Sequence, residues 1–500
     1  MEPLGTIKMH FPHVDEETRS ILVAIMEEAD NFADFLERSY QRVMSESTSI
    51  LLEYLTVFFL LRTEKWNLID RLVQAGKVPS LAEPFVLCIN SQRGSDVTWK
   101  NMSDSLQKAI NEVPNDWFAT HLYLNWRRLV EFIYTETDVD VKPIEIITSN
   151  VNNNKDLEIF KSNLLLLQAD VQRRDRQVSD ALVNLREALD IAKKFDDQLF
   201  VAEIQLNIAD RLKLTDLKSA MDLLHSTIHQ YEKLGFGKRP SLLTVLGRVM
   251  TFRGEVNAGI EYIKEDASLR ESNDLPIWVQ NQVIAFFYNQ IGDGERALEI
   301  IDELKPMFIQ RSSAWCHLMS AWALYNLGKY NDAKDEFTIA QELALKSGRS
   351  EHILVNRIVE GLMDRADSKL RAAAECFEDV LRFLKQEPSP MFENICLLNL
   401  TEIEIEMMDD EVLVKDSEMS GPWMHKLFEH AKVKNLPGIT ARGKILMALL
   451  RQKQQRYDEM SKILEDVQET ANKSSSMRYL NRLVNERFPE YITEKVQRRD

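Results

Sequence analysis

A small residue recurs six times along the chain at intervals of 36 to 40 residues, and a large apolar residue follows each copy four positions later. The six small residues are Ala181, Ala220, Gly259, Ala297, Ala333 and Ala373. Two antiparallel helices joined by a short turn need small residues where their axes approach, because interaxial distances of about 8 to 10 Å leave no room for large side chains at every contact. A unit of this length cannot bury its apolar face alone, so neighbouring copies must stack. The spacing therefore predicts an all-α fold, an α-solenoid of antiparallel helix pairs.

The clearest copy is the stretch YNLGKYNDAKDEF, which runs from Tyr325 to Phe337. It lies between two stretches whose apolar residues recur at helical spacing. We expect a first helix over about 312–327, a turn at Gly328 and a second helix over about 331–347. Ala321, Ala333 and Ala340 supply the small residues that this close approach requires.

The order of small residue, turn glycine, Tyr, Ala, large apolar residue and Ala resembles the tetratricopeptide repeat family. Two further copies share these residue types: Ala285, Gly292, Ala297 and Ile301, and before them Gly247, Gly254, Gly259 and Ile263. Further copies lie around Ala169, Gly361 and Ala448, and a looser copy lies around Ala209. Because the intervals exceed 34 residues, the long helices resemble the repeat arms of bacterial and archaeal regulators. The resemblance implies a right-handed superhelix, and the alternative is a generic helical bundle.

Three regions are expected: 1–157, helical and either degenerate repeats or a cap; 158–475, the repeat array; and 476–500, a C-terminal capping helix and tail. In the first region we expect a long helix capped by Asp15 and extending to about Met44. Shorter helices follow at about 47–61, 64–75, 97–113 and 116–134. The stretch 135–156, with Pro143 and an Asn run, is typical of a linker.

The composition restricts the classes of partner. A formal charge of −17 and a pI near 5.2 oppose binding to a phosphate backbone, so no direct nucleic-acid partner is expected. The most apolar stretch, 50–61, contains Glu53 and is too short to span a bilayer. The first residues lack an export signal, and the four cysteines are scattered, so we expect a cytoplasmic protein with reduced core thiols.

No enzyme signature is found, and no catalytic residue, cofactor or metal is predicted. His225 and His229 lie one helical turn apart, but Ser226 occupies the place where a zinc protease needs Glu. The segment 235–240 lacks the full glycine and hydroxyl spacing of a phosphate-binding loop, so it is expected to be a turn. Cys316 and His317 are adjacent on a helix and cannot easily share a proton, which favours a core role for Cys316.

The first helices of the pairs would line a concave groove, and the resemblance selects the positions that face it. These positions are Arg248, Gln282, Phe286, Asn289, Gln290, Trp315, Trp322, Tyr325 and Asn326, with Thr251, Met319 and Asn207 in addition. Amide side chains can pair with the backbone of an extended peptide of any sequence, and aromatic side chains supply contact area. The alternative for the aromatic residues is packing between repeats. The Lys and Asn clamp that some tetratricopeptide proteins use for C-terminal carboxylates is not reproduced.

These observations predict a non-enzymatic scaffold or adaptor that holds a protein or peptide ligand in the groove, with no membrane involvement. The alternative is a peptide-responsive regulator whose superhelix changes shape and which acts through another chain. A third class, an enzyme with an unrecognised site in 1–157, would need a motif that we do not find. Residues 402–418 hold eight carboxylates against Lys415, which indicates a solvated loop or a site for a basic partner.

Overall fold

The computed structural model describes residues 5–8, 10–92, 97–113, 116–133, 158, 160–174, 178–273, 275, 277–307, 313–347, 350–386, 388–408 and 421–497. These residues form helices and connecting turns, with no strand among them. The chain divides into two compact units. Unit 1 comprises Met1–Arg211, Ala220–Leu242 and Ser268–Pro276, and unit 2 comprises Leu212–Ser219, Leu243–Ala267 and Ile277–Asp500. The all-α prediction is confirmed for the described ranges.

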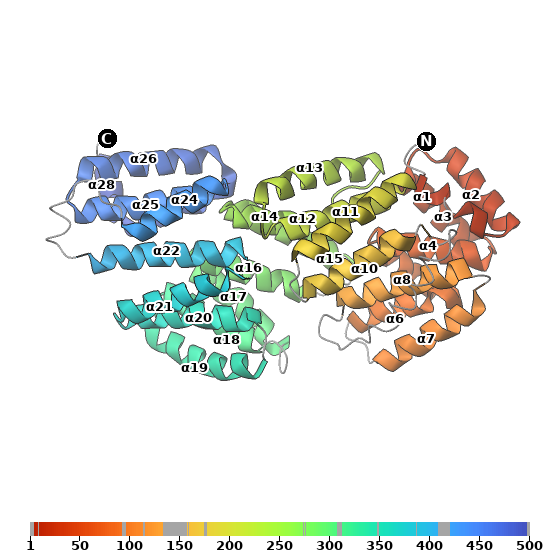
Figure 1. The fold of residues 1–500 in the computed structure, drawn as a ribbon, viewed down its shortest axis with the longest axis horizontal. Helices are drawn as coiled ribbons and strands as arrows, with labels where there is room; N and C mark the ends of the chain where they lie inside the picture. The colour runs from red at the N-terminus through yellow and green to blue at the C-terminus, as the bar shows by residue number, and fades with distance from the viewer. Residues whose placement is uncertain are drawn as a thin grey trace. The chain divides into compact units, whose positions relative to one another are not determined.

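Unit 1 contains the N-terminal helix α1, a set of short helices and the first two predicted repeats (Figure 1). Its elements are α1 (Gly5–Lys8), η2 (Phe11–His13), α2 (Glu16–Glu28), α3 (Phe32–Ser45), α4 (Ile50–Arg62), α5 (Trp66–Gln74), η3 (Ser80–Ala82), α6 (Glu83–Gln92), α7 (Trp99–Glu112), α8 (Asp116–Ile133), α10 (Phe160–Arg174), α11 (Val178–Lys194), α12 (Gln198–Leu212) and most of α13 (Leu217–Lys233).

Unit 2 is a run of antiparallel helix pairs, and Figure 1 shows α22 between the α18–α21 group and the α24–α26 group. Its elements are α14 (Pro240–Phe252), α15 (Val256–Glu271), α16 (Trp278–Gln290), α17 (Gly294–Leu304), η5 (Lys305–Met307), α18 (Ser313–Asn326), α19 (Tyr330–Ser347), α20 (Ser350–Ala366), α21 (Leu370–Phe383), α22 (Pro390–Met407), α24 (Pro422–Val433), α25 (Pro437–Lys453), α26 (Tyr457–Lys473), η6 (Ser475–Met477), α27 (Tyr479–Arg487) and α28 (Pro489–Gln497). The first turn of α14 and the last turn of α15 belong to unit 1.

The small residues of the repeat lie where the two helices of each pair meet. All six of the residues that define the period are buried, and the five alanines among them are 0% exposed. At Gly247 a Cβ atom would lie 2.9 Å from the main-chain oxygen of Gly259, so two glycines allow α14 and α15 to approach closely. The turn glycines Gly292 and Gly328 have φ of +75° and +71°, in the left-handed region that glycine favours. The repeat register predicted from the sequence is therefore confirmed.

Unit 2 closes on itself because its first turn contacts helices that come much later in the chain. Asn394 on α22 donates its Nδ2 to the main-chain oxygen of Phe252 at 2.9 Å. The Tyr479 hydroxyl of α27 donates to the main-chain oxygen of Gly254 at 3.0 Å. A Cβ atom at Gly438, the second residue of α25, would lie 2.0 Å from that same oxygen. Helices α22, α25 and α27 therefore all contact the turn between α14 and α15.

The N-terminal part differs from the sequence prediction in two places. The expected long helix is divided into α2 and α3, because Ala29 is extended and Asn31 caps a new helix by accepting from the Asp34 amide at 3.0 Å. Asp15 does cap α2, as predicted, by accepting from the Thr18 amide at 2.7 Å. Helix α6 was not predicted at all. The two compact units do not coincide with the expected boundaries at 157 and 475, and that division stays a prediction.

The prediction that residues 402–418 form a loop is wrong for residues 402–407. Residues 402–407 belong to α22, where Glu404 accepts from the main-chain amides of Trp423 and Met424 at 3.2 Å and so caps α24. Residues 409–418 and the expected linker at 135–156 lie outside the described residues. Across the described ranges, no helix is long and apolar enough to cross a membrane.

Candidate binding surface of unit 2

The first helices of the pairs meet one another inside unit 2, and we call them the inner helices. They are α14, α16, α18, α20, α22, α25 and α27. Successive members pack together, as α16 does with α18, α18 with α20, and α22 with α25. Any ligand held by the inside of the array would have to contact side chains of these helices.

Two of the predicted groove aromatics are core residues. Phe286 is 7% exposed and Trp322 is 4% exposed. Their rings meet edge to face at 5.6 Å between centroids, and Phe286 makes the same kind of contact with Phe392 of α22 at 6.2 Å. Phe392 of α22 thus lies against Phe286, and Phe286 lies against Trp322. The packing alternative is therefore supported for Phe286 and Trp322, and their direct contact with a ligand stays a prediction.

The asparagine side chains predicted to bind a ligand form hydrogen bonds between neighbouring repeats instead. Asn289 is buried and donates its Nδ2 to the main-chain oxygen of Met319 at 3.0 Å. Asn326 donates its Nδ2 to the main-chain oxygen of Asn289 at 3.0 Å. The side chains thus pair with backbone, as their chemistry predicts, but the backbone belongs to the neighbouring repeat. Asn289 lies three residues before its turn glycine and Asn326 only two, so the two asparagines do not occupy the same register.

The remaining predicted positions divide by burial. Arg248, Gln282, Gln290, Trp315, Tyr325 and Asn326 are partly exposed. Met319 is 0% exposed, and Thr251 is buried with its hydroxyl donating to the main-chain oxygen of Gly247. Asn207 lies in unit 1 and donates to the Glu203 oxygen one turn earlier on its own helix. The partly exposed residues are the ones that retain surface for a ligand.

A cluster of charges on the inner helices was missed by the sequence reasoning. Glu402 of α22 accepts from Arg365 of α20 at 3.0 Å and from Arg487 of α27 at 2.6 Å. Arg365 also pairs with Glu406, one turn further along α22. Arg442 of α25 lies within electrostatic range of Arg487 and Glu402. We call Arg365, Glu402, Glu406, Arg442 and Arg487 the inner charged cluster.

The charges of this cluster are strongly coupled. Burial alone would raise the pKa of Glu402, but Arg487 and Arg365 lower it, and the net pKa is about 2. Burial alone would lower the pKa of Arg365, but Glu402 and Glu406 raise it above its usual range. Tyr325 lies beside the same charges, and burial is the main reason that its pKa rises to about 12. Glu402 therefore remains ionised and holds two arginines in place at neutral pH.

A signal for two of these residues was present in the sequence. Arg365 follows Gly361 by four residues, as Tyr325 follows Ala321, and Arg442 precedes Ala448 by six residues, as Trp315 precedes Ala321. Both arginines therefore occupy registers that the resemblance assigns to the groove in another repeat. Glu402 and Arg487 lie outside the copies that the sequence pattern covers well, so no comparable signal was available for them.

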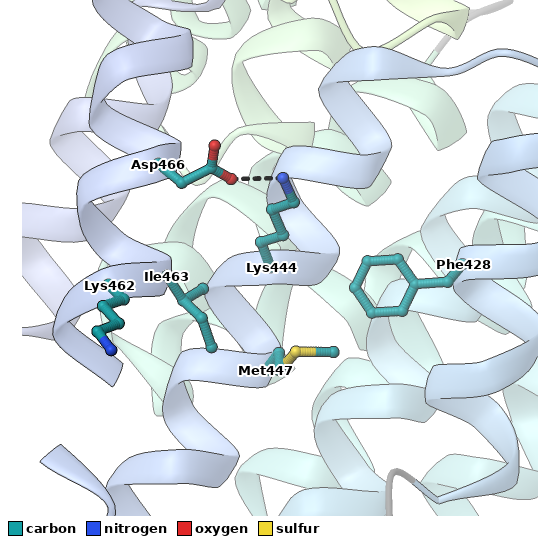
Figure 2. Close-up of a pocket in the computed structure, with 6 residues that line it drawn as sticks. All are labelled: Phe428, Lys444, Met447, Lys462, Ile463 and Asp466. Carbon is teal, nitrogen blue, oxygen red and sulfur yellow. Dashed lines mark hydrogen bonds and ion pairs between the residues drawn. The ribbon is translucent and has the colours of Figure 1, made fainter. Parts of the chain in front are cut away.

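A shallow hollow of about 340 Å³ lies elsewhere in unit 2, between α24, α25 and α26. Figure 2 shows Phe428, Met447 and Ile463 on its apolar side, with Lys462 at the edge and Lys444 directed at Asp466. The Lys444–Asp466 ion pair satisfies both charges. The hollow is apolar and its one acid is neutralised by Lys444, so it carries no catalytic proposal.

The histidines and cysteines that the sequence analysis considered form no reactive group in the described residues. His225 and His229 are exposed on α13. Cys88, Cys316, Cys376 and Cys396 are buried, as predicted, and Cys316 is core. His317 pairs with Glu336 at 2.6 Å. Within the described ranges, no group of three His, Cys, Asp or Glu side chains is placed to hold a metal ion.

Comparisons with known proteins give a likeness to solved structures only. No family model matches the chain, and no curated protein matches it. A Rap protein complexed with competence and sporulation factor is 14% identical, with 66% of this chain and 99% of that chain covered and a TM-score of 0.42. The apo form of RapI is 11% identical over 77% and 98%, with a TM-score of 0.42. Yeast Tom70 is 12% identical over 90% and 96%, with a TM-score of 0.33. At these values the likeness identifies neither a family nor a ligand.

Proposed function

We propose that the chain is a non-enzymatic binding protein of the tetratricopeptide type, which holds an extended segment of a protein or peptide against the inner helices of unit 2. The observation that carries this proposal is the convergence of Tyr325, Arg365, Glu402, Arg442 and Arg487. These side chains come from five successive inner helices. Arg365 and Arg487 both donate to Glu402, and Tyr325 and Arg442 lie within electrostatic range of that carboxylate. A surface built by successive repeats suits a ligand that extends from one repeat to the next.

The chemistry of this surface suits a chain segment. Trp315 and Tyr325 are partly exposed aromatic residues on α18, and such residues supply much of the binding energy of protein interfaces. Gln282 is a partly exposed amide on α16, and it can both donate to and accept from a peptide backbone. The arginines add charged donors. This combination provides contact area, backbone recognition and electrostatic selectivity on neighbouring helices.

Affinity capture from the source lysate with matched variants tests the proposal. We expect Trp315→Ala combined with Tyr325→Ala to reduce capture of the main partner at least tenfold, because truncating an aromatic hot spot costs about 2 kcal/mol. The control is Ile339→Ala combined with Tyr457→Ala, which truncates two exposed side chains on the second helices α19 and α26. The control should capture as the wild type does. Equal capture by all three proteins, with unchanged melting temperatures, would reject the proposal.

The regulatory alternative also has a structural observation in its favour. The closure of unit 2 depends on polar contacts between distant segments, including Arg482, which donates to the main-chain oxygen of Ile291. A ligand that bound open and closed forms with different affinity would shift the balance between them. Spin labels on cysteines introduced at Glu261 and Asn472 report this change, because the native cysteines are buried and react poorly. If the distance between the two labels changes when the partner binds, the regulatory function is supported. If the distance stays the same, the scaffold function is supported.

A further inference from the structure

The first described residues of the chain are docked on the rest of unit 1. We call residues 5–8 and 10–14, which include α1 and η2, the strap. The Thr6 hydroxyl donates to the Asp197 carboxylate at 2.8 Å and accepts from the Leu199 amide at 3.3 Å. At Gly5 a Cβ atom would lie 2.4 Å from a main-chain oxygen in the turn before α12, so the two backbones touch. One end of the strap is therefore fixed at the start of α12.

The other end of the strap is an aromatic contact around His10. The His10 side chain is 0% exposed, and its ring meets the rings of Phe59, Trp117 and His121 edge to face at 5.3 to 5.4 Å. The His13 ring stacks on the same indole, with 4.3 Å between centroids. With both histidines in place, Trp117 is only 4% exposed. The strap therefore covers an aromatic surface that α4 and α8 form.

The polar atoms at this end of the strap are poorly satisfied. Neither ring nitrogen of His10 has a hydrogen-bond partner among the described residues, and the same holds for Nε1 of Trp117. Burying a polar group without a hydrogen bond is unfavourable, so these atoms oppose the docked position. Ring packing alone holds His10 against this opposition.

The surroundings of His10 also exclude a proton. The titratable groups that face this contact from the strap, α4 and α8 are His13, Tyr54, Arg62 and His121. None of them is a carboxylate. Arg62 is itself paired with Glu203 at 3.0 Å and lies 3.8 Å from Asp197. Burial, with smaller effects from Arg62 and His13, lowers the pKa of His10 to about 3. An imidazolium at this position would meet a cation and no acceptor.

We propose that the strap is a proton-released cover, which leaves unit 1 when His10 is protonated and so opens the aromatic surface of Phe59 and Trp117. This inference is independent of the proposed function, which concerns unit 2. A released His10 takes up a proton below pH 6.5, whereas the docked one stays neutral down to about pH 3. The strap is therefore docked most firmly above pH 6.5, and its release becomes more favourable as the pH falls.

Hydrogen exchange measured by mass spectrometry on the full chain tests the release. Exchange is compared at pH 7.5 and 5.5, after correction for the effect of pH on the intrinsic rate. Between these values, protonation of one histidine raises the ratio of released to docked strap about tenfold. We expect this increase in the strap and at the Leu199 amide, which Thr6 covers. Helix α4, in the core of unit 1, should stay protected. Loss of protection in the strap and α4 together would mean unfolding of the unit and would overturn the proposal.

Three variants assign the effect. His10→Phe keeps a ring in the aromatic contact but cannot take up a proton, so most of the increase at pH 5.5 should disappear. The matched control is His225→Phe, at an exposed position of α13, which should behave as the wild type. Thr6→Val removes the hydroxyl anchor at the other end of the strap. It should speed exchange of the strap at both pH values and keep the tenfold increase.

Thr6→Val tests the proposal even if His10→Phe fails to fold, because it leaves His10 unchanged. The proposal is wrong if strap exchange in the wild type and in Thr6→Val does not change with pH. It is also wrong if His10→Phe keeps the full increase, because the proton would then act elsewhere.

Discussion

The Asn394 side chain donates its Nδ2 to the main-chain oxygen of Phe252 at 2.9 Å, across 142 positions of sequence. Its Oδ1 accepts from His430 Nε2 at the same distance. His430 also lies 3.2 Å from Glu393, and the pKa of Glu393 is about 2 because His430 and Lys434 outweigh the effect of burial. One buried amide therefore joins the first turn of unit 2 to α22 and α24. This contact is one of several that close the array.

Asn394→Ala should lower the free energy of unfolding by about 2 kcal/mol or more, because it leaves two buried groups without hydrogen-bond partners. The control is Asn399→Ala on the same helix, where the Asn399 side chain donates to the Ile395 oxygen one turn earlier rather than to a distant segment. That change should cost about 1 kcal/mol or less. Equal losses in urea unfolding would show that the contact with Phe252 does not stabilise the closed array.

Gly254→Ala should be more destabilising than Gly292→Ala. Both glycines have positive φ, +83° and +75°, so both substitutions carry the backbone penalty of about 1 kcal/mol. At Gly254 a Cβ atom would also lie 2.7 Å from main-chain atoms of Gly438 and Ile439, whereas nothing lies within 4 Å at Gly292. We expect a clearly lower melting temperature for Gly254→Ala. Identical melting temperatures would contradict the close approach of α25 to this turn.

Ala333→Leu should destabilise the array, because Ala333 is 0% exposed at the contact between α18 and α19. Overpacking of this kind costs about 1 to 3 kcal/mol. Thr338→Leu, at an exposed position of the same helix, is the control and should change the melting temperature little. A melting temperature for Ala333→Leu that equals or exceeds the wild-type value would mean that the repeat register is wrong.

Unit 1 should lose stability in mild acid because it buries neutral histidines. His10 is 0% exposed, and its ring meets Phe59, Trp117 and His121 edge to face at 5.3 to 5.4 Å. Burial, with smaller effects from Arg62 and His13, lowers the pKa of His10 from 6.5 to about 3. Between pH 6.5 and about 3, His10 is therefore protonated in the unfolded chain but neutral in the folded chain. The stabilisation is complete above pH 6.5 and falls as the pH drops toward 3.

The variant His10→Phe isolates this effect. For the wild type we expect His10 to contribute a loss of about 1 kcal/mol between pH 7.5 and 5.5, measured by urea unfolding with tryptophan fluorescence. The loss should be smaller in the variant, and the remainder reports His121, whose pKa burial also lowers. The same pH dependence in both proteins would show that His10 is not buried in its neutral form.

The repeat could be predicted from the sequence because small residues at a fixed period reflect a local requirement. Ala333 must be small for α18 and α19 to meet, whatever the rest of the array does. The burial of Phe286 and Trp322 could not be predicted from such a local pattern. The burial of Phe286 depends on the curvature of unit 2, which brings Phe392 onto its ring, and curvature accumulates over many repeats rather than in one. Truncation of Trp322 therefore tests folding before it tests binding.

For the inner charged cluster, the positions of two arginines could be predicted from the repeat pattern, but their ion pairs could not. The registers of Arg365 and Arg442 repeat those of Tyr325 and Trp315, so their place on the inner helices could have been read from the sequence. Their pairing could not, because Arg487 reaches Glu402 across 85 positions.

The most direct test of the central claim, that the inner helices of unit 2 hold the partner, is site-specific photocrosslinking. Benzoylphenylalanine replaces Tyr325 on the inner helix α18 in one protein and Ile339 on the second helix α19 in another. On irradiation in the source lysate, we predict a covalent adduct with the main partner from position 325 and none from position 339. An adduct from position 339 with none from 325 would contradict the claim and place the binding surface on the outer helices.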